Sequence, residues 1–150
     1  MNAARRPLNF ASLDRVMPDV DRLLEGHKTV GNWTLGQICN HLTGAIASTI
    51  DGFRFQAPWM VRKTVGPLLV RRVLRVSRMP EGAPLPEKYL PTPDKDARAE
   101  AEALRAALRL LSAHTGPLAV HPFGAKFSRA EWERFHCIHC AHHLSFVLPA

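Results

Sequence analysis

The chain has 150 residues, a formal net charge of +7 and an apolar content of 46%, which exclude a disordered protein and favour one globular domain over residues 1–150. No run of about 18 apolar residues occurs, so we expect no transmembrane segment. The positive charge favours anionic partners in general without identifying one.

The amino terminus predicts a cytoplasmic protein. Residues 1–7 contain two arginines but no apolar segment follows them, so no signal peptide is expected. Three cysteines, an odd number, favour free thiols over a disulfide framework. The chain has no recognisable nucleic-acid-binding motif, so we expect no specific nucleic-acid partner.

Phe10 to Gly26 is the first predicted helix. Ser12 is the candidate N-cap, apolar residues recur at helical spacing after it, and Gly26 suits the C-terminal end. Pro18 is expected to kink this helix or to reset its start.

The second helix is predicted from Thr34 to about Ile50. Thr34 and Gln37 have the spacing of a capping box, in which each side chain accepts a hydrogen bond from the other residue's backbone N–H. His41 lies on its apolar face. An inward histidine is usually a hydrogen-bonded core residue, but a second histidine-rich helix favours a ligand role here. The apolar residues of this face are Ile38, Leu42, Ala45 and Ile46.

From Pro58 a basic amphipathic helix is predicted, bent or split at Gly66-Pro67. Its apolar residues at helical spacing are Val61, Val65, Leu69, Val73 and Val76, and its arginines on another face are Arg71, Arg75 and Arg78. Such a helix can lie on an anionic membrane or bind nucleic acid, but a solvated outer face is the more common explanation.

Residues 79–93 contain five prolines, which predict an extended crossover along the surface. Asp94 or Asp96 then begins a helix of strong helix formers that ends between Ser112 and Gly116. Leu104, Leu108 and Leu111 are expected to face the core. The fold class predicted from these elements is all-α, a four-helix bundle with a long Pro-rich crossover.

The last helix is predicted to begin at Ser128, which forms a second capping-box pattern with Glu131, and no glycine or proline follows until Pro149. At about 100° per residue, His136, His139 and His143 fall within roughly 60° of one another. These three residues form a histidine stripe on one side of the helix.

Imidazoles four residues apart on a helix can share a metal ion. Both His139/His143 and His136/Cys140 have this spacing, and the spacing alone does not rank them. Two ligands rarely make a tight site, so a third is expected from another helix. His142 lies about 100° from His143 and is the poorer candidate.

Two other features have weaker functional interpretations. His121, in the loop before the last helix, could border a pocket, but a loop histidine is usually solvated. The Cys137-Ile-His-Cys140 spacing allows a redox or structural zinc site, but buried free thiols are the simpler expectation because the βαβ context of a redox motif is missing.

Several short motifs occur along the chain: Asn9-Phe10-x-Ser12-Leu13, Gly31-Asn-Trp33-Thr-Leu-Gly36-Gln37-Ile-Cys-Asn40-His41-Leu42, Asp51-Gly-Phe53, Ala57-Pro-Trp59, His121-Pro-Phe-Gly124 and His139-x-x-His142-His143-Leu. Together they resemble the DUF1569 family of the DinB-like (DinB/YfiT) superfamily of metalloenzymes. The match runs nearly end to end and implies a DinB-like bundle. Where many superfamily members have an Arg-Gly-Gln-like sequence after the last ligand, this chain has Leu144-Ser145-Phe146.

In that superfamily, one histidine from a helix that opens with a Trp-[Ser/Thr]-x-Gly-Gln-like turn joins two histidines four residues apart on the last long helix. The resemblance therefore implies His41, His139 and His143 as ligands of a divalent Zn, Ni, Fe or Mn ion. Characterised superfamily members include thiol-dependent transferases and isomerases and metal-dependent hydrolases. A metal-dependent transferase or hydrolase, in which the ion activates a thiol or a water, is the expected activity.

We expect further roles around this site. His136 could serve as an acid or base, and Gln37 and Asn40 could orient ligands or substrate, while Trp33 and Trp132 should wall the core. A small molecule, for example an anionic low-molecular-weight thiol, is the expected substrate, and a homodimer is one expectation. The alternative is a non-catalytic metal- or ligand-binding helical bundle.

Overall fold

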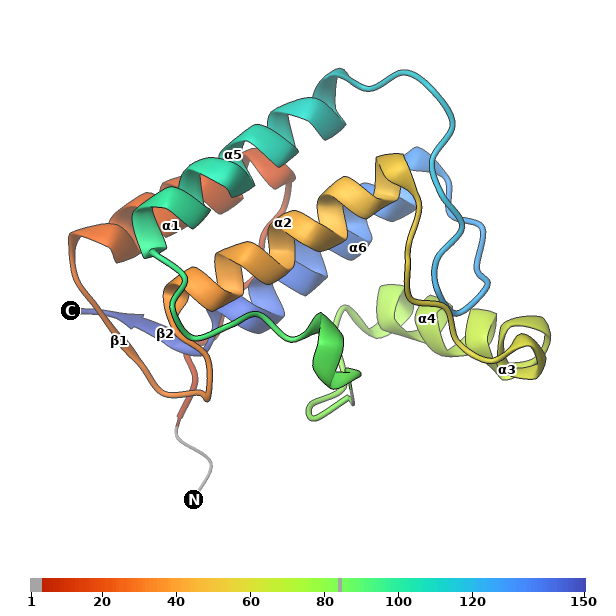
Figure 1. Ribbon diagram of the computed structural model, residues 1–150, viewed down its shortest axis with the longest axis horizontal. Helices are drawn as coiled ribbons and strands as arrows, with labels where there is room; N and C mark the ends of the chain where they lie inside the picture. Colours follow the sequence, from red (N-terminus) through yellow and green to blue (C-terminus); the bar gives the residue numbers. More distant parts are fainter. Residues whose placement is uncertain (1–3, 84) are drawn as a thin grey trace.

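The computed structural model describes residues 4–83 and 85–150, most of which are helical (Figure 1). The α-helices are α1 (Val16–Glu25), α2 (Leu35–Asp51), α3 (Trp59–Lys63), α4 (Val65–Val76), α5 (Ala97–Ala113) and α6 (Arg129–Leu144). Two 3-10 turns, η1 (Leu13–Arg15) and η2 (Glu87–Tyr89), and two short strands, β1 (His27–Thr29) and β2 (Val147–Pro149), complete the secondary structure of these residues.

Local sequence signals set the starts of the long helices. Thr34 and Gln37 form the predicted capping box of α2, with hydrogen bonds of 2.9 and 3.2 Å. Ser128 and Glu131 form the predicted capping box of α6. Asp96 caps α5 by accepting a hydrogen bond from the N–H of Ala99 at 2.8 Å. These predicted starts are confirmed.

The main core lies where α1, α2, α5 and α6 meet. α2 packs against both α5 and α6, and α1 packs against α5 (Figure 1). Leu104 and Leu111 on α5 are buried, as their spacing predicts. The larger fully buried side chains of this core include Val20, Leu23, Leu35, Leu42, Ile46 and Leu144. Because α2 is in contact with α6, side chains on their facing sides can meet.

A second, smaller core forms between α4, α6 and the loop that leads into α6. Its buried members are Val70, Val73, Leu74, Ala125, Phe127, Trp132, Phe135 and Ile138. Trp132 is fully buried, and its indole N–H donates to the carbonyl of Ala119 at 3.1 Å. This second core joins α4 to the face of α6 that carries the histidines.

The two strands are the main departure from the predicted elements. β1 and β2 pair antiparallel, with Lys28 opposite Leu148. The last helix therefore ends at Leu144, and the chain turns so that Val147 can pair with Thr29. The prediction of one helix up to Pro149 is wrong because this pairing joins segments far apart in the sequence, which a local pattern does not reveal.

The first helix differs from its prediction at its start. α1 begins at Val16, so Pro18 lies in its first turn, where the missing N–H costs no intrahelical hydrogen bond. Pro18 therefore resets the start, one of its two expected effects. The predicted cap at Ser12 is wrong, because its hydroxyl donates to the carboxylate of Asp14 instead.

The basic segment after Pro58 splits into α3 and α4 at Thr64, two residues before Gly66. Its inward face is made by Val70, Val73 and Leu74. Three residues that the spacing placed on the apolar face are about half exposed: Val65 at 51%, Leu69 at 53% and Val76 at 48%. The expectation that Val73 packs inward is confirmed.

The crossover between α4 and α5 runs along the surface as predicted, apart from the single turn η2. Pro84 within it and Met1 to Ala3 at the amino terminus lie outside the described residues. Among the residues that the structure describes, no helix combines the length and apolar character needed to cross a bilayer.

Candidate metal centre

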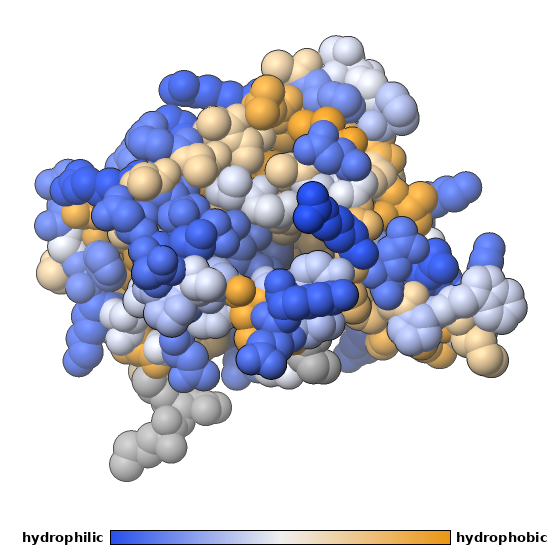
Figure 2. Space-filling view, in the orientation of Figure 1, coloured by the Kyte–Doolittle hydropathy of each residue, from blue (hydrophilic) through white to orange (hydrophobic). Residues whose placement is uncertain are grey.

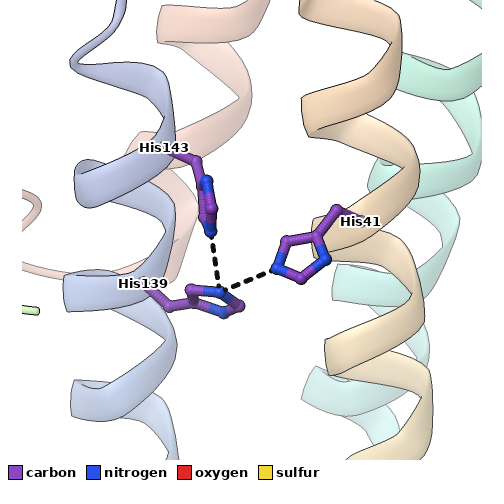
Figure 3. Close-up of side chains that lie close together, drawn as sticks. All are labelled: His41, His139 and His143. Atoms are coloured by element: carbon purple, nitrogen blue, oxygen red, sulfur yellow. Dashed lines mark hydrogen bonds between the residues drawn. The ribbon is translucent and has the colours of Figure 1, made fainter. Parts of the chain in front are cut away.

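Three imidazoles meet between α2 and α6. His41 projects from α2, and His139 and His143, one turn apart, project from α6 (Figure 3). The Nε2 atoms of His41 and of His143 each lie 3.1 Å from Nε2 of His139. One nitrogen from each ring lies within 4.8 Å of the other two. The structure thus brings together the three residues predicted as metal ligands, which we call the histidine triad.

The triad fits a cation better than it fits a hydrogen-bond network. Nε2 of a neutral imidazole has either one proton or one lone pair, so Nε2 of His139 cannot make good hydrogen bonds to both neighbours. Two nitrogens that are each about 2.1 Å from one divalent ion lie about 3.0 to 3.4 Å apart for ligand angles between about 90° and 110°. The two 3.1 Å distances from Nε2 of His139 fall in that range, and the nitrogens of His41 and His143 lie within 4.8 Å of each other.

Burial keeps the triad uncharged. Burial first, and the nearby His142 second, lower the pKa of His41 to about 4. The pKa values of His139 and His143 also lie well below the usual value of 6.5, because of burial first and neighbouring imidazoles second. At neutral pH each ring therefore has a lone pair that a metal ion can bind.

Trp33 covers one side of the triad. Its indole stacks on His143, with ring centres 5.4 Å apart and planes at 9°, and it also contacts His41 at 5.1 Å. The loop that carries it is held to the end of α6 by a 2.8 Å hydrogen bond from the N–H of Val30 to the carbonyl of Phe146. This bond lies next to the paired strands and links the loop of Trp33 to the segment that follows α6. Sequence reasoning missed the contact of Trp33 with the triad, and its only signal was a tryptophan directly before the cap of α2.

His139 is oriented by packing. Its Nδ1 atom is buried and has no hydrogen-bond partner among the described residues. Metal-binding histidines usually donate their second N–H to a carboxylate or carbonyl. Here the ring is positioned by His41, His143 and Phe135, with ring centres 4.8 to 5.9 Å away.

His136 lies in the same stripe but takes part in a different contact. It is almost fully buried, stacks on Trp132 at 5.3 Å, and its Nε2 lies 2.8 Å from the hydroxyl of Thr49. The Thr49 hydroxyl also lies 3.1 Å from the carbonyl of Ala45, to which it can donate. Donation from Nε2–H of His136 to Thr49 therefore satisfies these two atoms, whereas the buried Nδ1 of His136 has no hydrogen-bond partner among the described residues. Burial first, then His121, lowers the pKa of His136 to about 3.

Gln37 and Asn40 are engaged in contacts between helices and loops. The Gln37 side chain accepts from the N–H of Thr34 in the capping box and donates to the carbonyl of Pro91 in the crossover at 3.1 Å. Asn40 donates to the carboxylate of Glu100 on α5 at 3.0 Å. The catalytic roles expected for His136 and Gln37 stay predictions.

The remaining histidines near α6 lie outside the triad. His142 is next to His143 but borders a separate cavity of about 300 Å³ that is also lined by Arg5 and Arg78. His121, expected to be solvated, is instead buried against Trp132 and Phe135. Its Nδ1 accepts a hydrogen bond from the N–H of Phe123, and burial lowers its pKa to about 4.

All three cysteines are buried free thiols, as predicted. Burial raises the pKa of Cys39 to about 12 and that of Cys137 to about 11, and it also raises that of Cys140. Among the described residues, neither His136 nor Cys140 belongs to a group of three possible metal ligands, and Cys140 packs in the main core.

The fold and the site define a mainly helical protein in which two helices hold a cluster of three histidines. A family model described as "Protein of unknown function (DUF1569)" matches residues 2–150, so the chain belongs to the DUF1569 family. No curated protein and no solved structure matches the chain. The family expected from the sequence motifs is confirmed.

Proposed function

We propose that the protein is a metal-dependent enzyme of the DinB-like superfamily, in which His41, His139 and His143 hold one divalent cation. The observation that supports this proposal is the spacing of the three uncharged Nε2 atoms, which come from two helices. Three protein ligands leave coordination positions open, which is typical of catalytic sites. Imidazole binds Zn, Ni, Fe and Mn, and the availability of these ions decides which one occupies the site.

A cation bound to the triad would lower the pKa of a bound water or thiol, which supplies a nucleophile near neutral pH. The chain's own contribution is positional: α2 and α6 hold the three rings, and Trp33 excludes solvent from one side of His143. We therefore propose a transferase or hydrolase reaction on a small molecule. The net charge of +7 supports an anionic thiol as a cosubstrate.

We also propose that the protein has the architecture of the DinB-like superfamily. The packing of α1, α2, α5 and α6 supports a DinB-like four-helix bundle with a long crossover. A cytoplasmic location and a homodimer stay predictions.

The alternative is a helical protein that binds a metal ion without catalysis. One observation favours it: neither the cavity of about 300 Å³ beside His142 nor one of about 530 Å³ beside Ser112 and Arg129 is lined by a triad histidine. A substrate needs space next to the cation. A protein that binds the metal ion but shows no turnover that depends on it would support this alternative.

Metal content tests the ligand assignment. Protein purified without a histidine tag is expected to carry about one divalent ion per chain, measured by elemental analysis, because one nitrogen from each of three imidazoles lies within 4.8 Å of the other two. The triple variant His41→Ala, His139→Ala, His143→Ala is expected to lose it.

The matched control is His142→Ala, which removes an imidazole next to the triad but outside it. This variant should keep the metal content of the wild type. Equal metal in the wild type and the triple variant would show that the ion binds elsewhere.

A further inference from the structure

Six apolar side chains on the neighbouring helices α3 and α4 are exposed to solvent. We call this set the α3–α4 face, and it consists of Trp59, Met60, Val65, Leu68, Leu69 and Val76. Met60 and Leu68 are each 68% exposed and Trp59 is 64% exposed. Figure 1 shows the two helices at one end of the protein, on the side opposite α1 and α5.

α4 has two apolar faces, of which the fold buries one. At about 100° per residue, the four exposed aliphatic residues of α4 occupy an arc of about 100°. The centre of that arc lies about 130° from the centre of the buried face of Val70, Val73 and Leu74. The second face is therefore not required for packing within the described chain.

The segment that carries this face is basic, although two of its arginines, Arg71 and Arg78, pair with Glu131 and Glu81. Residues 52–80 contain seven arginines and lysines and no aspartate or glutamate. Arg72 lies within the exposed apolar arc and Arg75 at its edge, and neither they nor Lys63 form an ion pair with any residue in 4–83 or 85–150. Figure 2 shows strongly hydrophilic and apolar side chains next to each other at this end of the molecule.

Close contacts at both ends of α4 hold this helix against the rest of the fold. Gly66 in the first turn of α4 packs against the loop before α6, where an added Cβ would lie 2.3 Å from the carbonyl oxygen of Phe123. On the other end of α4, Arg134 of α6 donates to the carbonyl of Leu74 at 2.7 Å. The backbone of α4, which carries four of the six exposed side chains, is therefore held in place at both ends.

We propose that the α3–α4 face binds an anionic lipid bilayer, with α4 lying in the plane of its surface. An interfacial helix needs both features seen here: aliphatic and aromatic side chains that enter the headgroup region, and arginines or lysines beside them that pair with lipid phosphates. The attraction of these cations to anionic headgroups is expected to be strong only near the surface and to weaken with salt.

Two other partners fit less well. A second copy of the chain that used the same face would place two clusters of cations against each other with no acidic residue of this segment to offset them. Nucleic acid would pair with Arg72 and Arg75, but it would leave exposed residues such as Leu68 without an apolar partner.

Vesicle flotation tests the proposal. The wild-type protein is expected to float with vesicles of phosphatidylcholine and phosphatidylserine, to float much less with phosphatidylcholine alone, and to be released by high salt. The double variant Leu68→Ser, Leu69→Ser should bind at least about tenfold more weakly, because two exposed leucines no longer enter the lipid. The variant Arg72→Glu, Arg75→Glu should also bind at least about tenfold more weakly.

The matched control is Arg109→Glu, Leu110→Ser on α5, where Leu110 is 65% exposed. This control should float as the wild type does. No flotation of the wild type, or equal flotation of the wild type and the leucine variant, would overturn the proposal. A dimer in solution that the leucine substitutions dissociate, or DNA binding that only the arginine substitutions weaken, would assign the face to another partner and overturn it as well.

Discussion

Burial controls the charge of the histidines near α6. His121 and His136 pack around the indole of Trp132, and their pKa values lie at about 4 and about 3. In both residues burial is the main cause. Both rings are neutral at physiological pH. Protonating either ring would place a positive charge in a buried site without water, which is unfavourable.

Acid is therefore expected to destabilise the protein. An unfolded histidine binds a proton near pH 6.5, but His121 in the folded protein does so only near pH 4, so the unfolded state binds more protons between these values and stability falls as the pH falls. For His121 alone the loss is about 2 kcal/mol by pH 5. Urea unfolding at pH 7.5, 6 and 5 measures it.

The variant His121→Gln removes this titrating group and should make the free energy of unfolding less dependent on pH. If the wild-type free energy of unfolding were the same at pH 7.5 and pH 5, the argument from burial would be wrong.

The triad was only partly predictable at the level of residues. His139 and His143 follow from their spacing, but His136 and Cys140 have the same spacing. What separates the pairs is the rotation of α6 against α2, which directs Cys140 into the main core and places His139 and His143 opposite His41. That rotation depends on packing between distant segments, so the resemblance to DUF1569, and not the spacing, ranked His139/His143 above His136/Cys140. His41 was already a candidate because it is a histidine on an apolar helix face.

The starts of the two helices with a capping box were more predictable than the buried face of α4. The capping boxes at Thr34 and Ser128 depend on residues three apart, and both form as predicted. The buried face of α4 was not predictable in the same way. The apolar residues of α4 lie on two faces of the helix, and both faces show helical spacing. Val70, Val73 and Leu74 are the buried ones because they pack against α6 and Phe127.

Two glycines of α2 are expected to respond in opposite ways to substitution by alanine. Gly44 is exposed and a Cβ there would meet no atom within 4 Å, so Gly44→Ala should raise the free energy of unfolding by about 0.5–1 kcal/mol. A Cβ on Gly36 would lie 2.1 Å from the carbonyl oxygen of Lys95, so Gly36→Ala should lower it by about 1–3 kcal/mol.

Urea unfolding of the two variants measures both changes. Because the helix and the substitution are the same, each variant is the control for the other. A stabilising Gly36→Ala would mean that α2 and the start of α5 do not approach as closely as described.

At the scale of the whole molecule, the least predictable feature is the pairing of β1 with β2. Three-residue strands are too short to show an alternation of apolar and polar residues. Their pairing connects residues 27–29 with residues 147–149, which are far apart in the sequence. The side chain of Arg6 strengthens this junction by donating to the carbonyl of Val147 and to the carboxylate of Asp19. Nothing local in the sequence indicates it.

A cation bound to the triad would connect α2 with α6 and should stabilise the whole fold. Ligand binding to the native state alone raises the free energy of unfolding by about 2.7 kcal/mol at a free concentration about 100 times the Kd. Urea unfolding with added zinc should therefore show a higher midpoint than unfolding with a chelator. The triple histidine variant should show no difference between the two conditions, and a difference of wild-type size in that variant would place the ion at another site.

The burial of Cys39, Cys137 and Cys140 has a practical consequence for studying this protein. These are the three cysteines of the chain, and their raised pKa values make them slow to react with maleimides or methanethiosulfonates while the protein is folded. A cysteine introduced at an exposed position of α4 would react first. A fluorophore or a nitroxide spin label can therefore be attached there without removing a native thiol, and its emission or mobility would report the surroundings of that helix.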